Sequence, residues 1–501
     1  MKKQILLGAA LLFAASMSFG QGQGEGVREC GDCSLPQLEC MDCSFELNIP
    51  TQIGAVGENS SEYDQDGIDN SVTVNQLGTE NFSYVKQNGL MNVLGGVGNS
   101  ATVDQTGNRN HSWIKQDGDY NTGTVTQIGE RNFAKQDVGV GYAEHNIASA
   151  FQDGDDNVSR QKQRFDNNWA SVDQVGLSNY AEQDQSSNFN SVDGSDATII
   201  QRGDDNQAKQ VQRGSGNIAW AYQTDWYGNG MNPNISSENQ NSTAGGSSWN
   251  DSKVFQYGSG NESCVDQFAR RGGTNTSTVY QFSSSSNYSY VTQNAINGTN
   301  NSNVQQGAFI LFGNGYPQWF YTFTSNNIAK VDQTAFSGGS NTSDVYQAVS
   351  DNIAYILQFA ETGGTNISTV TQFGDSNTAG VEQSASSGGL NTAVVTQGMD
   401  FFDPWTTDNP ADGNEAYVTQ NAVDGFYNYS FSQQLGLNNW LCVDQTAIGG
   451  NNDSYIYQDG MNNSAYVNQN AIDANNYSMG NQNGNGNSAC IYQTGNSSVQ
   501  F

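Results

Sequence analysis

The stretch that decides the fold is Asn121-Thr-Gly-Thr-Val-Thr-Gln127, one copy of a unit made of Asn, five residues and Gln. About 30 copies follow one another from residue 59 to the end of the sequence, so the chain is a repeat protein. Inside each unit the residues alternate with a period of two, which is the period of a β-strand. The repeat therefore predicts a succession of short strands.

One face of these strands is nearly constant along the chain. It reads Asn, a small residue, a β-branched residue and Gln, as in Asn377, Ala379, Val381 and Gln383. The other face varies freely, so we expect the constant face to form the interior. Buried amides need partners, and identical strands stacked in register allow each amide to bond to the same residue above and below. The representative inner residues are Asn70, Val72, Val74, Gln76, Asn121, Val125, Gln127, Asn377, Ala379, Val381, Gln383, Asn487 and Gln493.

The links between units set the architecture. Later in the sequence a short link, such as Gln372 to Asn377, alternates with a longer one, such as Gln383 to Asn391. This alternation predicts two strands per rung, one tight edge and one loose edge. The expected fold is an all-β solenoid of stacked two-strand rungs, with about 22–25 residues per rung and roughly 18 rungs. Aromatic-rich insertions interrupt it near 224–233, 307–326 and 398–413.

Residues 1–20 have the features of a secretory signal peptide, namely Lys2 and Lys3 followed by a short apolar run and small residues. Residues 21–58 form a separate segment, in which Cys30, Cys33, Cys40 and Cys43 make two C-x-x-C pairs. Because an oxidising compartment favours disulfides, these four cysteines are candidate disulfide partners. Zinc binding and cross-links to another chain or surface are the alternatives. The solenoid is expected over 59–501.

The composition excludes several function classes. The 501 residues carry a formal net charge of −32, spread along the chain, and nucleic-acid binding needs a basic face, so nucleic acid is not an expected partner. The two histidines, His111 and His145, have no partnered nucleophile, and His111 falls on the outward face, where we expect it to be solvated. The chain is therefore not expected to be an enzyme, and neither a cofactor nor a metal site is expected.

The variable face carries an aromatic residue at the third position after Asn in many units. These residues are Tyr84, Trp113, Trp220, Tyr290, Tyr355, Tyr417, Phe431, Tyr455 and Tyr466. Either these residues form a stacking column along the rod, or they occur at this position only because aromatic residues have a high β-propensity. Cys264, Cys442 and Cys490 occupy the same position, each after a short link, which places them on one sheet. Two rungs separate Cys442 from Cys490, too far for a mutual disulfide, so buried thiols and inter-chain links are the two interpretations.

The repeat resembles the curlin repeat of bacterial curli fibre subunits, whose strands have the form Ser/Asn-x-Ala/Leu-x-Val/Ile-x-Gln. Asn217-Ile-Ala-Trp-Ala-Tyr-Gln223 and Asn391-Thr-Ala-Val-Val-Thr-Gln397 fit this form closely, and Gln105-Thr-Gly-Asn-Arg-Asn110 is similar to the family's turn. This chain is far longer than familiar members and carries an additional cysteine-rich segment.

The resemblance implies export through an outer-membrane secretion pore of a Gram-negative-type bacterium, with assembly factors and a nucleator subunit. Assembly into functional-amyloid fibres of a biofilm matrix would follow at the cell surface, where the homopolymer adheres to host or abiotic surfaces. The last residues, Ser497 to Phe501, are a shortened strand still in the repeat pattern, which favours addition of one solenoid to the next. A monomeric cell-surface adhesin or ligand-binding solenoid is the alternative.

Overall fold

The structure is a computed structural model and describes residues 58–88, 97–188, 193–225, 233–242, 248–283, 286–313, 316–321, 326–398, 412–495 and 497–500. The chain divides into two compact units, Met1–Cys33 and Ser34–Phe501, and every described residue belongs to the second. The expected signal peptide (1–20) and the cysteine-rich segment up to residue 57 lie outside the described residues.

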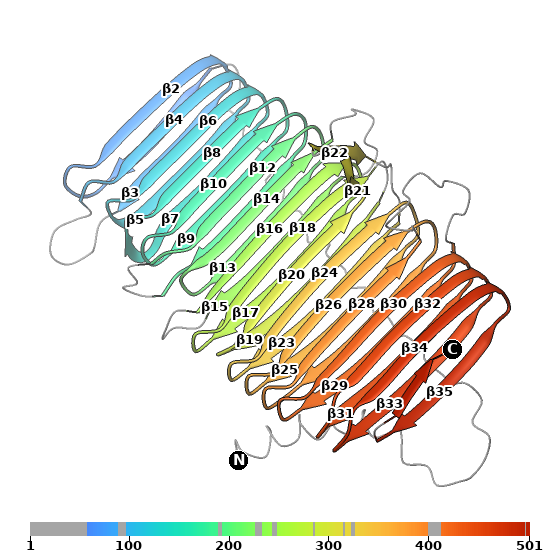
Figure 1. The fold of residues 1–501 in the computed structure, drawn as a ribbon. Coiled ribbons are helices and arrows are strands. Elements are labelled where there is room, and N and C mark those ends of the chain that lie inside the picture. Colours follow the sequence, from blue (N-terminus) through green and yellow to red (C-terminus); the bar gives the residue numbers. More distant parts are fainter. Residues whose placement is uncertain are drawn as a thin grey trace, which may run out of the picture. The chain divides into compact units, whose positions relative to one another are not determined.

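The described part of the second unit is a parallel β-solenoid, as the sequence predicts (Figure 1). The chain alternates between two large sheets, which we call the odd sheet and the even sheet after the numbers of their strands. The odd sheet comprises β1 (Ser60–Gln65), β3 (Phe82–Asn88), β5 (His111–Asp119), β7 (Phe133–Glu144), β9 (Val158–Arg164), β11 (Tyr180–Ser186), β13 (Gln207–Arg213), β15 (Ile235–Ser242), β17 (Glu262–Arg270), β19 (Tyr288–Ile296), β23 (Ile328–Phe336), β25 (Ile353–Glu361), β27 (Thr378–Ala385), β29 (Glu415–Val423), β31 (Trp440–Ile448), β33 (Ser464–Ile472) and β35 (Ser488–Thr494).

The even sheet comprises β2 (Ser71–Thr79), β4 (Ser100–Asn108), β6 (Thr122–Glu130), β8 (Ile147–Asp153), β10 (Trp169–Val175), β12 (Asp196–Arg202), β14 (Asn217–Thr224), β16 (Trp249–Gly258), β18 (Thr274–Ser283), β20 (Thr299–Gln306), β24 (Ser340–Ala348), β26 (Thr365–Phe373), β28 (Leu390–Gln397), β30 (Tyr427–Leu437), β32 (Asn452–Met461), β34 (Asn476–Asn485) and β36 (Ser497–Gln500). The odd sheet has 17 strands, which gives 17 rungs where the sequence led us to expect roughly 18.

Identical positions of the repeat pair along each sheet. Gln333 of β23 lies opposite Gln358 of β25, which in turn lies opposite Gln383 of β27. These glutamines are separated by 25 residues each, and nearer the N-terminus the separation falls to 22. The expected rung of 22–25 residues is therefore observed, and insertions lengthen individual rungs to as many as 41 residues.

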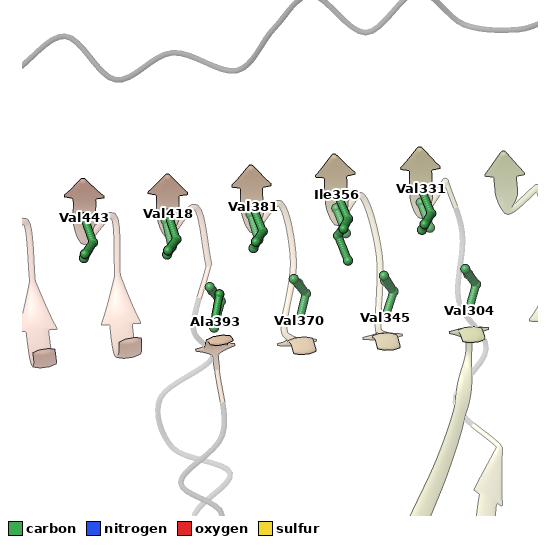
Figure 2. Close-up of a cluster of buried hydrophobic side chains, with 14 of the residues drawn as sticks. Val304, Val331, Val345, Ile356, Val370, Val381, Ala393, Val418 and Val443 are labelled. Atoms are coloured by element: carbon green, nitrogen blue, oxygen red, sulfur yellow. The ribbon is translucent and has the colours of Figure 1, made fainter. Parts of the chain in front are cut away.

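The core is a thin double row of small and β-branched side chains. Val304, Val345 and Val370 of the even sheet point toward Val331, Ile356 and Val381 of the odd sheet (Figure 2). All six are at most 1% exposed. Such a narrow interior needs little apolar material per residue, which explains how a chain with only 35% hydrophobic residues folds.

Glycine makes the tight edge. Gly107, at the end of β4, has a φ of +114°, and a Cβ there would lie 2.0 Å from the carbonyl oxygen of Gly129 in the next rung. Only glycine combines that backbone angle with so close an approach.

Of the three predicted insertions, 307–326 contains an antiparallel pair, β21 (Ala308–Gly313) with β22 (Tyr316–Tyr321), outside both large sheets. The central parts of the other two insertions lie outside the described residues.

Candidate assembly surfaces

Buried amide ladders run along the interior of the solenoid. The Nε2 atom of Gln333 donates to Oε1 of Gln358 at 2.8 Å, and Nε2 of Gln358 donates to Oε1 of Gln383 at 2.8 Å. Each amide also bonds across the core, as Gln358 Nε2 does to the carbonyl oxygen of Thr342 at 3.0 Å. The ladder satisfies amides that would otherwise be costly to bury.

The asparagines form a second type of ladder at the tight edge. Asn352 Nδ2 donates to Oδ1 of Asn327 at 3.1 Å, and Asn377 Nδ2 donates to Oδ1 of Asn352 at the same distance. Asn352 Nδ2 also bonds to the carbonyl oxygen of Gly374, 2.8 Å away, and so holds the neighbouring turn. Each of these asparagines thus bonds both to the ladder and to the neighbouring turn.

The two ladders have opposite directions. Glutamine amides donate toward the C-terminal rungs, as from Gln105 to Gln127 and from Gln445 to Gln469. Asparagine amides donate toward the N-terminal rungs, as from Asn110 to Asn81. Any surface at which the stack is interrupted therefore presents glutamine acceptors and asparagine donors on one side, and glutamine donors and asparagine acceptors on the other.

The first and last described rungs have one unpaired edge each within the described residues. There β1 pairs only with β3, and β35 pairs only with β33. At the first rung the inner residues Val72 and Val74 are only partly buried, although they pack against the core. These rung edges are the candidate assembly surfaces.

The structure places the predicted inner residues on the inner face. Asn121, Val125, Gln127, Asn377, Ala379, Val381, Gln383 and Gln493 are buried, whereas Asn70, Val72, Val74 and Gln76 near one end are partly buried and Asn487 near the other is exposed. The burial of an inner residue therefore depends on how close its rung lies to an end of the solenoid. The repeat pattern itself does not encode that distance.

The nine outward aromatic residues divide between the two sheets. Tyr84, Trp113, Tyr290, Tyr355, Tyr417 and Tyr466 lie on odd strands, whereas Trp220, Phe431 and Tyr455 lie on even strands. Other residue types interrupt each column, for example Lys330 between Tyr290 and Tyr355. Tyr84 and Trp113, in adjacent rungs, have ring centroids 4.5 Å apart. The aromatic residues thus form local clusters on both faces.

Exposure differs strongly between these aromatic residues. Trp113 is 41% exposed and Tyr455 38%, whereas Tyr355 is only 8% exposed although it also lies on an outer face. Burial raises the pKa of Tyr355 to about 12. A side chain at an outward-facing position of the repeat can therefore still be buried.

His111 was expected to be solvated, and that expectation is wrong. Its side chain is on the outer face of β5 but only 6% exposed, with the ring of Phe82 in the neighbouring rung 5.8 Å away. Burial lowers the pKa of His111, because the charged imidazolium loses its hydration. The flanking aromatic residues in the adjacent rungs, Phe82 and Phe133, account for the burial.

Cys264, Cys442 and Cys490 lie on β17, β31 and β35, all in the odd sheet, as the link lengths predict. All three are disulfide-bonded, so neither Cys442, which is fully buried, nor the others are simple buried thiols. The four predicted disulfide candidates, Cys30, Cys33, Cys40 and Cys43, lie outside the described residues.

The sequence analysis missed a third ladder that contains a carboxyl group. From β7 to β13 the β-branched inner position holds Gln136, Gln161, Gln183 and Gln210, which bond in series and end on Glu238 of β15. Glu238 is 1% exposed, and burial raises its pKa to about 7. The second glutamine in Asn157-Val-Ser-Arg-Gln-Lys-Gln163 is the signal that could have revealed this ladder.

Within the described residues no three His, Cys, Asp or Glu side chains are grouped so that they could hold a metal ion. The same part of the chain contains no apolar helix of membrane-spanning length. The rung edges present hydrogen-bonding amides, and the outer faces present exposed aromatic rings.

Neither a family model nor a curated protein matches this chain. The similarity to the curlin repeat therefore rests on the residues of the repeat itself.

Proposed function

We propose that this protein is a secreted structural subunit that assembles end to end into curli-like extracellular fibres of a biofilm matrix. The opposite directions of the glutamine and asparagine ladders carry the proposal. If the first rung of one copy follows the last rung of another, Gln493 Nε2 faces Gln65 Oε1, and Asn59 Nδ2 faces Asn487 Oδ1. Each donor then meets an acceptor, as it does between rungs inside the chain.

The reverse arrangements are disfavoured by the same geometry. Two first rungs placed edge to edge would pair strands that run in opposite directions, so Asn would lie opposite Gln and neither ladder would continue in register. Unpaired amides cost about 1–3 kcal/mol each when buried. The interface would thus be heterologous, the type that generates filaments when it does not close into a ring.

The net charge is consistent with this role. A charge of −32 keeps separate copies apart until specific edge contacts form, and screening by salt weakens that repulsion. Export of the chain to the cell surface of a Gram-negative-type bacterium, through an outer-membrane pore with assembly factors and a nucleator, belongs to the same proposal. The proposal also includes a purely structural, non-enzymatic role for the chain.

A monomeric adhesin or ligand-binding solenoid is the second candidate. It is favoured by exposed aromatic side chains on the outer faces, such as Trp169 at 44% and Trp220 at 39%. Aromatic rings of this kind suit the binding of sugars or surfaces. The two functions differ in whether the rung edges or the outer faces make the essential contact.

The test is the assembly state of the purified chain. The chain lacking residues 1–20 is incubated at high concentration for days in 0.15 M salt and followed by light scattering and electron microscopy. Filaments whose width matches one solenoid, with growth from one end of a marked seed, support the proposal. A chain that stays folded and monomeric throughout would contradict the fibre proposal. The monomeric adhesin would then be the remaining candidate function.

A matched pair of variants locates the contact. Val74→Lys introduces a charge at the inner face of the first rung and is expected to block elongation, because β2 has an unpaired edge there. Trp220→Lys, on an outer face, is expected to leave elongation unchanged. The reverse result would move the essential contact to the outer faces.

A further inference from the structure

The outer face of the odd sheet carries a basic strand and an acidic strand near the N-terminal end of the solenoid. On β9 three successive outward positions hold Arg160, Lys162 and Arg164. On β1 and the residue after it the equivalent positions hold the exposed residues Glu62, Asp64 and Asp66. The register through β3, β5 and β7 places Glu62 in the column of Arg160 and Asp64 in the column of Lys162. The two strands thus carry opposite charges at equivalent positions.

Most of these charges have no counter-charge within the chain. Among the described residues, the three cations of β9 form no ion pair, and the Nε atom of Arg160 is buried without a hydrogen-bond partner. The acidic residues beside β9 are already engaged at 2.7–3.2 Å, in the ion pairs Lys135–Asp137, Lys209–Glu182 and Arg213–Asp184. On the acidic strand, Asp64 pairs with Lys86 at 3.0 Å. Since β1 and β9 are four rungs apart, about 19 Å, they cannot neutralise each other within one chain.

A two-fold axis would bring the two strands together. An axis that runs parallel to the strands and crosses the outer face at β5 reverses the order of the strands and turns two copies of the face toward each other. In that arrangement β1 of one copy lies over β9 of the other, the strands run in the same direction, and each position of the repeat lies opposite the same position. Sheets packed face to face are about 10 Å apart, within reach of long charged side chains.

We propose that two copies of this chain form a face-to-face dimer through the outer face of β1, β3, β5, β7 and β9. The dimer pairs Glu62 with Arg160 of the partner subunit, Asp64 with Lys162 of the partner subunit, and Asp66 with Arg164 of the partner subunit. Because a two-fold interface is isologous, each ion pair occurs twice. The dimer does not depend on the proposed fibre, since it uses the outer face and leaves the rung edges free.

The strands between β1 and β9 also match. In the same arrangement β3 lies over the partner's β7, which brings Lys86 against Asp137 of the partner subunit. One position earlier on the same face, the ring of Tyr84 meets Lys135 of the partner subunit, and a cation over an aromatic ring is an attractive contact. The register that fixes the outer ion pairs therefore fixes favourable contacts inside the interface as well.

The centre of the interface is aromatic. On the two-fold axis Trp113, which is 41% exposed, packs on Trp113 of the partner subunit, and large aromatic residues are typical of interface centres. Lys115 also meets its own copy near the axis, but Asp117 neutralises each lysine from 2.7 Å away. An aromatic centre flanked by charged pairs is the usual composition of a specific interface.

The size of the face makes the dimer a weak one. Five strands at about 4.8 Å spacing and seven residues at about 3.3 Å each give a footprint of about 550 Å² per copy. The total of about 1,100 Å² lies at the low end of specific interfaces. The net charge of −32 opposes association, but at about 0.15 M salt charges farther apart than about 8 Å are screened, so the contacts within the face decide.

The test is a charge exchange between the two strands, measured by sedimentation velocity of freshly purified chain over a concentration series. One variant carries Arg160→Glu, Lys162→Glu and Arg164→Glu, and the other carries Glu62→Lys, Asp64→Lys and Asp66→Lys. Each alone is expected to weaken dimerisation at least about tenfold, because like charges then face each other. An equimolar mixture of the two is expected to dimerise as the unaltered chain does, because each variant offers the charge that the other needs.

The matched control carries Lys253→Glu, Arg270→Glu and Arg271→Glu, which change the net charge by the same amount outside the proposed interface. It is expected to dimerise as the unaltered chain does, and hydrogen exchange over β1 to β9 checks that every variant is folded. A chain that is monomeric at every concentration, an equal loss in the control, or no recovery in the mixture would overturn the dimer. Because sedimentation separates dimers from filaments, failure of the dimer and failure of the fibre are distinguishable.

Discussion

Replacing Glu238 by Gln tests how the interior accepts a carboxyl group. Gln210 Nε2 donates to Glu238 Oε1 at 3.1 Å, while Glu238 Oε2 has no partner in full hydrogen-bond geometry among the described residues. The side chain of Ser252 and the backbone of Trp220 lie near enough to lower the pKa of Glu238, but the effect of burial is larger. The next residue in the column is Val265, which offers no polar atom. Burial of this group therefore disfavours its charged form and raises its pKa from 4.5 to about 7.

The sign of the pH effect follows from this shift. Between pH 4.5 and about 7 the folded chain keeps the Glu238 proton while the unfolded chain has lost it, so stability falls as pH rises. The stability associated with the protonated carboxyl is fully present below pH 4.5 and lost by about pH 7. At about 1.4 kcal/mol per pKa unit, the loss at pH 8 is about 3 kcal/mol.

Glu238→Gln keeps the shape and the acceptor but removes the charge. We expect it to raise the local unfolding free energy around β15 by about 3 kcal/mol at pH 8 and to change it little at pH 4. Because a long solenoid does not unfold as one cooperative unit, the measurement is hydrogen exchange by mass spectrometry, restricted to peptides from β13 to β17 and corrected for intrinsic rates.

The control is Glu361→Gln, which alters an exposed carboxyl group at the end of β25. No pH-dependent gain in protection is expected from it. Equal protection of wild type and Glu238→Gln at pH 8, with the solenoid intact, would refute the assignment of a charged, desolvated Glu238. A gain of the same size at pH 4 and pH 8 would attribute the effect to packing instead.

Three further substitutions probe the ladders and turns by the same exchange measurement. Gln358→Ala is expected to cost about 3 kcal/mol in its own rung, because it leaves the Oε1 atom of the next glutamine without its donor and opens a cavity; protection equal to wild type would contradict the ladder. Ser289→Ala is expected to be neutral or to stabilise by about 1 kcal/mol, since Ser289 Oγ is buried without a partner, and marked destabilisation would reveal a missing bond. Gly107→Ala is expected to lower the local unfolding free energy by more than about 2 kcal/mol, because the added Cβ would collide with the next turn. Gly363 has no atom within 4 Å of an added Cβ, so Gly363→Ala is expected to cost only the strain of its φ of +77°, about 1 kcal/mol. Similar losses in the two variants would exclude the close approach as the cause.

Sequence alone determined the solenoid, because a period of two fixes which side chains share a face and the recurrence of the same face fixes what they stack upon. Val125 and Gln127 could be placed in the interior without any coordinates, and the lengths of the links placed Cys264, Cys442 and Cys490 on one sheet. These features depend on spacing along the chain, which the sequence displays directly.

Only the tertiary structure decided what surrounds each position. A strand period distinguishes inside from outside, but it does not say what lies in the next rung or over the outer face. The burial of His111 by Phe82 and Phe133, the carboxyl of Glu238 at the end of an amide column and the opposite directions of the two ladders all depend on contacts between residues at least 22 positions apart. Exposure, pKa and ladder direction are properties of those contacts, so they become visible only when the rungs are stacked.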